Sequence, residues 1–163
     1  MFHKRMEIIK QPTLPKLTIG IDEVGRGCFA GPVVAAAVAF DRYNLPNQKL
    51  LDQITDSKQL KTKLRKQIFN HLIREAHKKT PKLAYGVGIV DNHAIDQINI
   101  RKATHLAMQR ALDELYRKID KRFLNAILVD GRDNFSFEGF DQKPLFVING
   151  DQKVKEIGAA SII

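Results

Sequence analysis

Residues 17–40 carry the sequence LTIGIDEVGRGCFAGPVVAAAVAF, and this stretch predicts how the fold begins. Residues 17–23 and 33–40 are short apolar runs with several β-branched side chains, which is typical of strands. A glycine-rich loop joins them, so we expect the two strands to be antiparallel neighbours. The first run ends in two adjacent acids, Asp22 and Glu23.

These acids and the loop after them form the most informative motif of the chain. Carboxylates at the end of a strand can hold a divalent metal ion. The loop contains Gly25, Gly27 and Gly31, which allow its backbone to approach a ligand closely, and it carries one arginine, Arg26. The motif indicates a metal-dependent enzyme that acts on a phosphate-bearing substrate.

Length and charge fit this interpretation. A chain of 163 residues can bury one sizeable core but is too short for two ordinary domains. Its 27 basic and 18 acidic residues give a formal net charge of +9, which favours an anionic partner, with nucleic acid as the leading candidate. The lysines are spread along the chain, so a merely basic protein remains an alternative.

Cysteine content and hydropathy exclude several other classes. Cys28 is the only cysteine, so neither an intramolecular disulfide nor a cysteine-type zinc site is expected, and a reducing cytoplasm is the expected compartment. The longest apolar run, residues 33–40, is far below the roughly 20 residues of a membrane span, and residues 1–10 lack a signal core. We expect no membrane contact. The histidines show no ligand spacing and are predicted to be structural or exposed: His3, His71, His77, His93 and His105.

Helical and strand patterns alternate after the first two strands, which predicts an α/β fold. Residues 41–57 are rich in turn formers, and Ser57 is predicted to cap a helix that ends before Pro81. Lys58 could point at a phosphate from the start of that helix, although a cap followed by a surface lysine explains the pattern equally well. Residues 83–90 predict a third strand.

A long helical region is predicted from Asp91 or Asn92 onward. We interpret it as a core-facing helix with a solvated basic side. The basic side consists of Arg101, Lys102, Arg110 and Arg117.

The last third of the chain completes a mixed sheet of about five strands in one domain. Residues 126–130, AILVD, predict a strand buried on both faces, and residues 144–148 predict another. A final helix is expected from about Gln152. Residues 1–16 are polar, contain two prolines and are interpreted as an N-terminal lead-in.

Asp130 resembles the first two acids in position, because it also closes an apolar run. If its strand lies parallel to residues 17–23, the carboxyl ends meet and Asp22, Glu23 and Asp130 converge. Such a cluster is stable mainly with cations among the acids, and its oxygen ligands select Mg²⁺ or Mn²⁺. Successive strand residues face opposite sides, so the first strand must end or bulge at its acids for both to reach one metal. An ordinary turn residue remains the alternative for Asp130.

The glycine loop also matches a dinucleotide-binding fingerprint at Gly25, Gly27 and Ala30. We disfavour a nucleotide cofactor because Asp22 and Glu23 would repel its phosphates, and because the residues after the loop lack a polar helical face.

The motifs together resemble a known family, type 2 ribonuclease H or ribonuclease HII. The matching stretches follow the family's order and spacing from the first strand to the end of the chain. They are GIDEVGRG and AGPVVAAAV within residues 20–38, DSKQL at 56–60, INIRKATHLAMQRAL at 98–112, LVDG at 128–131 and GDQKVKEIGAASII at 150–163.

This resemblance implies an RNase H-like fold and an endonuclease that cuts the RNA strand of RNA/DNA hybrids, including ribonucleotides embedded in DNA. Two divalent ions would activate a water and stabilise the leaving 3′-oxygen. The implied catalytic and metal-binding acids are Asp22, Glu23 and Asp130. The implied loop that inspects the 2′-hydroxyl at the RNA to DNA junction is Gly25, Arg26 and Gly27. From its position in the sequence, we also expect Lys58 to contact nucleic acid. We expect a monomer.

Two features depart from the family. Cys28 replaces a usual proline, which we expect the loop to tolerate. The family continues beyond the ASII segment to a fourth carboxylate and to a tyrosine that stacks on the junction sugar, and neither follows Ile163. We therefore expect residues 17–163 to be an RNase H-like catalytic domain without the family's C-terminal part, either as a truncated product or as a natural remnant. A hybrid-binding or inert remnant with impaired catalysis is the alternative function.

Overall fold

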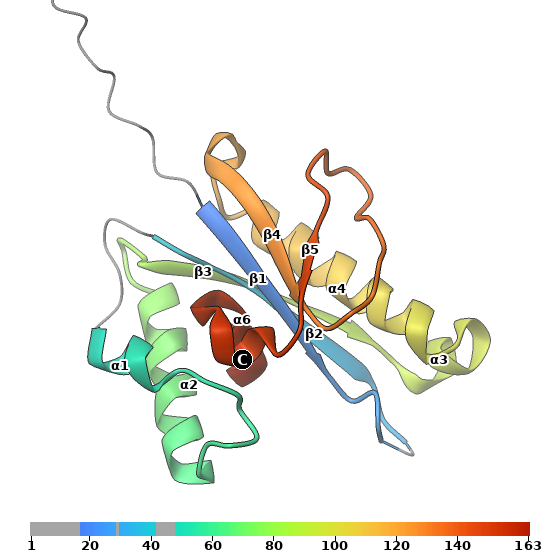
Figure 1. Cartoon of the computed structure of the whole chain (residues 1–163), viewed down its shortest axis with the longest axis horizontal. Helices are drawn as coiled ribbons and strands as arrows, with labels where there is room; N and C mark the ends of the chain where they lie inside the picture. Colours follow the sequence, from blue (N-terminus) through green and yellow to red (C-terminus); the bar gives the residue numbers. More distant parts are fainter. Residues whose placement is uncertain (1–16, 29, 42–47) are drawn as a thin grey trace, which may run out of the picture.

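The computed structural model describes residues 17–28, 30–41 and 48–163. The predicted lead-in, residues 1–16, lies outside these described residues. The described part forms a five-stranded mixed sheet with helices on both faces (Figure 1). The predicted α/β class with a mixed sheet of about five strands is confirmed.

The strands follow the order β3-β2-β1-β4-β5 across the sheet. β1 pairs antiparallel with β2, as predicted, and β2 pairs antiparallel with β3. β1 pairs parallel with β4, and β4 parallel with β5, so the carboxyl ends of the three strands meet at one edge. Their bounds are β1 Leu17–Val24, β2 Val33–Phe40, β3 Leu83–Val90, β4 Leu124–Asp130 and β5 Leu145–Val147.

The helices divide between the two faces of the sheet, and each face has its own apolar core. α4 packs across one face, whereas α1, α2 and α6 cover the other (Figure 1). Their bounds are α1 Gln48–Gln53, α2 Thr62–Ala76, α3 Asn92–Ile98, α4 Ile100–Tyr116, α5 Gly150–Lys153 and α6 Lys155–Ile162, with a short 3-10 helix at Lys121–Phe123.

Two glycines set how closely the helices approach the sheet. A Cβ atom at Gly88 of β3 would lie 1.9 Å from the carbonyl oxygen of Ala107 on α4, and one at Gly20 of β1 would lie 2.3 Å from the carbonyl carbon of Glu156 on α6. Side chains at these positions would push both helices outward. α6 therefore lies directly against β1, over the face of the sheet that includes residue 22.

The segment before α2 differs from its prediction. A short helix, α1, occupies part of the stretch predicted as turns. α2 begins at Thr62 rather than after Ser57, and its N-cap residue Lys61 makes no side-chain cap hydrogen bond. The hydroxyl of Ser57 is used elsewhere, since it lies 2.9 Å from the hydroxyl of Ser161 on α6. A tertiary contact has replaced the predicted local cap.

The two long helical predictions are each interrupted. The region that opens at Asp91 breaks at Asn99, whose φ of 69° ends α3, and the Asn99 side chain then caps α4 by accepting from the backbone N–H of Lys102 at 3.1 Å. The final helix is broken by Val154, whose extended backbone separates α5 from α6. This break lets α5 lie at the end of β4.

Candidate active site

Asp22 and Asp130 are neighbours on one face of the sheet. The parallel pairing of β1 and β4 matches Ile21 with Val129, so the next residue of each strand also lies side by side. Ile21 and Val129 belong to the core on the α4 face. Because side chains alternate along a strand, both aspartates point to the opposite face, which α6 covers.

Asp22 is 8% exposed, and the groups around its carboxyl act on its pKa in opposite directions. Its pKa is raised from 3.8 to about 7, mainly by burial and also by the charges of Glu23 and Asp130. The backbone N–H of Glu23, which donates to Asp22 Oδ1 at 2.8 Å, and the hydroxyl of Ser161 act the other way. A buried carboxyl beside other acids favours a proton or a bound cation.

Asp130 is held in place by the start of α5. Its Oδ1 accepts a hydrogen bond from the backbone N–H of Gly150 at 2.6 Å. A Cβ atom at Gly150 would lie 2.6 Å from Cδ1 of Ile157 and 3.2 Å from the same Asp130 oxygen. The absence of a side chain at residue 150 therefore allows α5 to approach the carboxylate and orient it.

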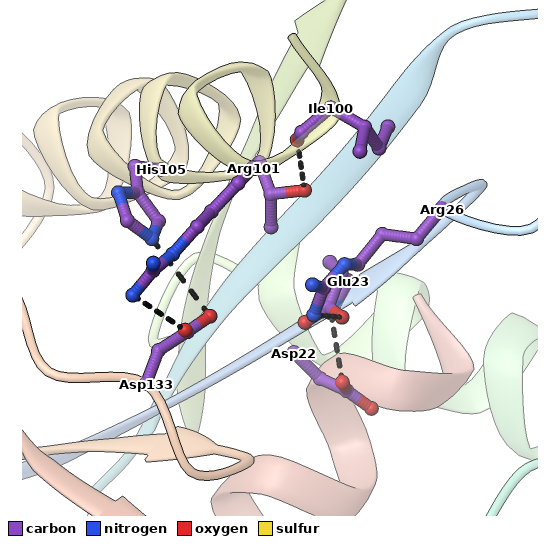
Figure 2. Close-up of polar contacts among 8 residues, drawn as sticks. Asp22, Glu23, Arg26, Ile100, Arg101, His105 and Asp133 are labelled. Carbon is purple, nitrogen blue, oxygen red and sulfur yellow. Dashed lines mark hydrogen bonds and ion pairs between the residues drawn. The ribbon is translucent and has the colours of Figure 1, made fainter.

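Glu23 lies on the other face. β1 runs in regular register with β2 through Glu23, opposite Ala35, and Val24, opposite Val34, so the prediction that the strand ends or bulges at its acids is wrong. The Glu23 Oε1 atom lies 3.3 Å from a terminal nitrogen of Arg26 (Figure 2). Burial raises the pKa of Glu23 against the opposing effect of the Arg26 charge.

The geometry thus brings two of the three predicted acids together and separates the third. Within the ranges that the structure describes, no three His, Cys, Asp or Glu side chains are grouped closely enough to hold a metal ion. Strand alternation turns Glu23 away from Asp22 and Asp130. The electrostatics nevertheless connect all three acids, since the charge of Asp130 raises the pKa of both Asp22 and Glu23.

A fourth acid, which the sequence did not predict, lies close to Asp130. Burial and the charges of Asp130 and Asp56 raise the pKa of Asp151 on α5, and Asp56 also hydrogen-bonds to it. Ser161 on α6 is a second residue of the site that the sequence did not predict, because its hydroxyl acts on Asp22. It lies within an apolar stretch, and a hydroxyl on an otherwise buried helical face is a signal that could have marked it.

Lys58 lies in a turn before α2 and not at a helix start, which corrects the prediction. Its side chain is exposed, and its backbone N–H donates to Asp56 Oδ1 at 2.9 Å. The turn is attached to α6 by the hydroxyl contact of Ser57 with Ser161 and by Lys155, whose Nζ donates to the carbonyl of Ile54 at 2.8 Å. Lys58 therefore directly follows Ser57, which contacts Ser161 of α6. Ser161 in turn interacts with Asp22.

The glycines of the loop after β1 have different roles. Gly25 has a φ of 103°, and a Cβ atom there would lie 2.5 Å from the carbonyl oxygen of Pro32, so this position requires glycine. A Cβ atom at Gly27 would meet no atom of the described structure within 4 Å. The backbone at Gly27 is consequently open to a ligand, and the neighbouring Arg26 side chain is 45% exposed.

The helices of the described part include none that is long and apolar enough to span a bilayer.

The sequence model of the ribonuclease HII family matches residues 19–163. The chain is 41% identical over 144 residues to ribonuclease HII of Caldicellulosiruptor bescii, covering 88% of this chain and 61% of that protein. It is also 41% identical over 148 residues to ribonuclease HII of Lactobacillus delbrueckii subsp. bulgaricus, covering 91% and 50%. The chain thus spans 50–61% of the length of these two curated relatives.

Solved structures resemble the fold over the same region. Ribonuclease H2 from Pyrococcus horikoshii OT3 superposes with a TM-score of 0.69 at 26% identity, covering 90% of this chain and 69% of that one. Bst-RNase HIII in complex with Mn²⁺ superposes with a TM-score of 0.72 at 26% identity, covering 91% and 50%.

Proposed function

The chain belongs to the ribonuclease HII family, and from that premise we propose that it is an endonuclease that hydrolyses the RNA strand of RNA/DNA hybrids and cuts at ribonucleotides embedded in DNA. The observation that carries the proposal is the pair of neighbouring carboxylates, Asp22 and Asp130, on one face of the sheet at the carboxyl ends of β1 and β4.

We propose Asp22 and Asp130 as ligands of one Mg²⁺ or Mn²⁺ ion on the α6 face, and Glu23, which points to the other face, as a ligand of a second such ion. The donor set fits a hard divalent cation, because it consists of carboxylate oxygens and because the charges of Glu23 and Asp130 oppose ionisation of the buried Asp22. A bound cation would replace the proton that Asp22 otherwise retains. Divalent ions held there would supply an activated water and stabilise the leaving 3′-oxygen. One of the similar solved structures is a complex with Mn²⁺.

The loop Gly25 to Gly27 is proposed to inspect the ribose. The open backbone at Gly27 supports this role, since a 2′-hydroxyl needs a close donor or acceptor to be recognised. Arg26 is paired with Glu23 in this structure. A cation on Glu23 would weaken that pair and leave the guanidinium available to a phosphate. Lys58 is proposed as a second phosphate contact from the turn before α2.

A second candidate function is hybrid binding without cleavage. One observation favours it: the described acids do not include a group of three that could hold a metal ion as they stand. Loss of a single metal ligand typically impairs catalysis severely, while a chain of net charge +9 would still bind nucleic acid.

A cleavage assay separates the two functions. The chain is incubated with Mg²⁺ or Mn²⁺ and three labelled duplexes: an RNA/DNA hybrid, DNA with one ribonucleotide, and DNA alone. We expect cleavage of the first two only, and loss of that cleavage in Asp22→Asn. Asp120→Asn is the matched control, because Asp120 pairs with Arg122 before β4, at the opposite end of that strand from Asp130. Salt-sensitive binding without cleavage by the unchanged chain would support the second function.

A further inference from the structure

Two arginine–carboxylate pairs lie near the carboxyl end of β1. One is Arg26 with Glu23, in the loop after β1. The other is formed by Arg101, in the first turn of α4, and Asp133, in the loop after β4. Figure 2 shows Arg101 reaching from α4 toward Asp133, while Arg26 lies over Glu23. The two pairs are close enough to interact, because the charge of Asp133 raises the pKa of Glu23.

Arg101 is oriented by a single contact and is otherwise open to solvent. One terminal nitrogen lies 3.2 Å from Asp133 Oδ1, and the Arg101 side chain is 63% exposed. No other polar contact of this guanidinium is found within the described ranges of the chain. A guanidinium carries five N–H donors in a fixed planar arrangement that matches a phosphate. Most of these donors are therefore available to a ligand.

His105, one helical turn after Arg101, lies beside Asp133. The imidazole of His105 lies against the ring of Phe135, with centroids 3.8 Å apart, and its buried Nε2 lies 3.8 Å from Asp133 Oδ2. Burial lowers the pKa of His105, which favours the neutral form of the ring. Arg101 is then the cationic partner of Asp133.

Arg101 is suited to exchanging Asp133 for a phosphate. An exposed arginine–carboxylate pair contributes little net stability, so its release costs little. A charge-assisted, bidentate contact with a phosphate is stronger than a single contact with an exposed carboxylate. Asp133 remains 27% exposed and can be solvated when Arg101 turns away.

We infer that Arg101 is a phosphate-binding residue of this protein, held ready by Asp133, which contacts the nucleic-acid backbone on the α4 side of the site, opposite the Arg26 loop. This inference rests on the proposed function for its ligand, a nucleic-acid duplex. It adds a contact that recognises the charge of the phosphate and does not distinguish ribose from deoxyribose. Arg101 should therefore contribute equally to an RNA/DNA hybrid and to a DNA duplex.

The chain provides a matched control in Arg122. It too is an exposed arginine with one aspartate, Asp120, at a short distance, but it precedes β4 and so lies at the opposite end of that strand from Asp130. Arg101→Ala and Arg122→Ala remove the same charge from opposite ends of the sheet. Asp133→Asn is the third variant, because it removes the tether and leaves the charge of Arg101 in place.

Binding is measured by fluorescence anisotropy in EDTA, so that no cleavage occurs, with a hybrid and a DNA duplex of equal length across a salt series. We expect Arg101→Ala to weaken binding to both duplexes about 3- to 10-fold and to reduce the salt slope by about one, whereas Arg122→Ala stays within about twofold. Asp133→Asn should bind as tightly as the unchanged chain or more tightly.

Equal losses in Arg101→Ala and Arg122→Ala would overturn the inference, and so would weaker binding by Asp133→Asn, because Arg101 would then matter only as a structural partner. Binding of neither duplex by the unchanged chain would also overturn it. Failure of the proposed function is a separate result, namely no cleavage of the hybrid with Mg²⁺ or Mn²⁺. A selective loss in Arg101→Ala would stand even then.

Discussion

Asp22 on β1 and Asp130 on β4 stand next to each other on the same face of the sheet, one residue beyond the paired Ile21 and Val129. Their strands are parallel, and α6 covers the face to which both carboxyls point. This single relationship places two like charges side by side, one of them buried, where a cation would relieve their repulsion.

Removing the charge of Asp22 should stabilise the metal-free chain. Its pKa of about 7 means that ionisation above neutral pH opposes folding, by up to about 4 kcal/mol for a shift from 3.8. Asn keeps an oxygen that accepts from the backbone N–H of Glu23. We therefore expect Asp22→Asn to raise the free energy of unfolding by roughly 1–3 kcal/mol at pH 8 in EDTA, measured by urea denaturation. Asp120→Asn should bring no such gain, and a destabilised Asp22→Asn would contradict the prediction.

The stability of the metal-free chain should fall as pH rises through the range between about 4 and 7. The folded state keeps the Asp22 proton up to about pH 7, whereas the unfolded state loses it near 3.8, so the folded state binds more protons in this window. The raised pKa values of Glu23 and Asp151 act in the same direction. The lowered pKa of His105 acts oppositely just below 6.5.

The comparison of pH profiles with and without Asp22 isolates this effect. The difference in unfolding free energy between the unchanged chain and Asp22→Asn should grow steadily from pH 4 to pH 7 and then level off. A difference that stays constant across this range would show that Asp22 does not retain its proton in the folded state.

Divalent metal ions should protect the chain in a way that depends on both aspartates. Binding to the folded state alone raises stability with the logarithm of the ion concentration. We expect Mg²⁺ or Mn²⁺ to raise the melting temperature of the unchanged chain, more at pH 8 than at pH 5, because Asp22 must lose its proton. Asp22→Asn and Asp130→Asn should each lose most of this shift, and Asp120→Asn should keep it. Equal shifts in all four proteins would locate the metal elsewhere.

Substitution by alanine should destabilise the chain at Gly20 but leave its stability unchanged at Gly27. Gly20→Ala would place a methyl group 2.3 Å from the backbone of α6, so we expect a loss of stability of about 3 kcal/mol or more together with loss of cleavage. Gly27→Ala meets no described atom within 4 Å, so its melting temperature should stay close to that of the unchanged chain while hybrid cleavage falls. Full activity in Gly27→Ala would argue against close contact of the loop with the ribose.

Local sequence patterns predicted the strands well, because their signals are local. β2 has the bounds that its apolar run indicated and β3 those that its strand-like pattern indicated, and the antiparallel pairing of β1 with β2 follows from the short loop between them. The parallel pairing of β1 with β4 was only a condition of the predicted site. The structure meets that condition.

The roles of Ser57 and Asp56 were not predicted correctly, because they depend on contacts between segments that are distant in the sequence. Ser57 does not cap α2, because its hydroxyl contacts Ser161. Asp56 and Asp151 meet only through the packing of the turn before α2 against α5. Strand alternation was the correct objection to three acids converging on one side, but the structure answers it by turning Glu23 to the other face and not by a bulge. The contacts of Ser57 and Asp56 arise from tertiary packing, which no local pattern encodes.

We propose that Asp22 and Asp130 share a divalent metal ion on the α6 face of the sheet, and anomalous diffraction from crystals soaked in Mn²⁺ would locate that ion. We expect an anomalous peak within ligand distance, about 2–2.5 Å, of a carboxylate oxygen of each aspartate. A peak that leaves either carboxylate unbound, or no peak on this face at saturating Mn²⁺, would contradict it.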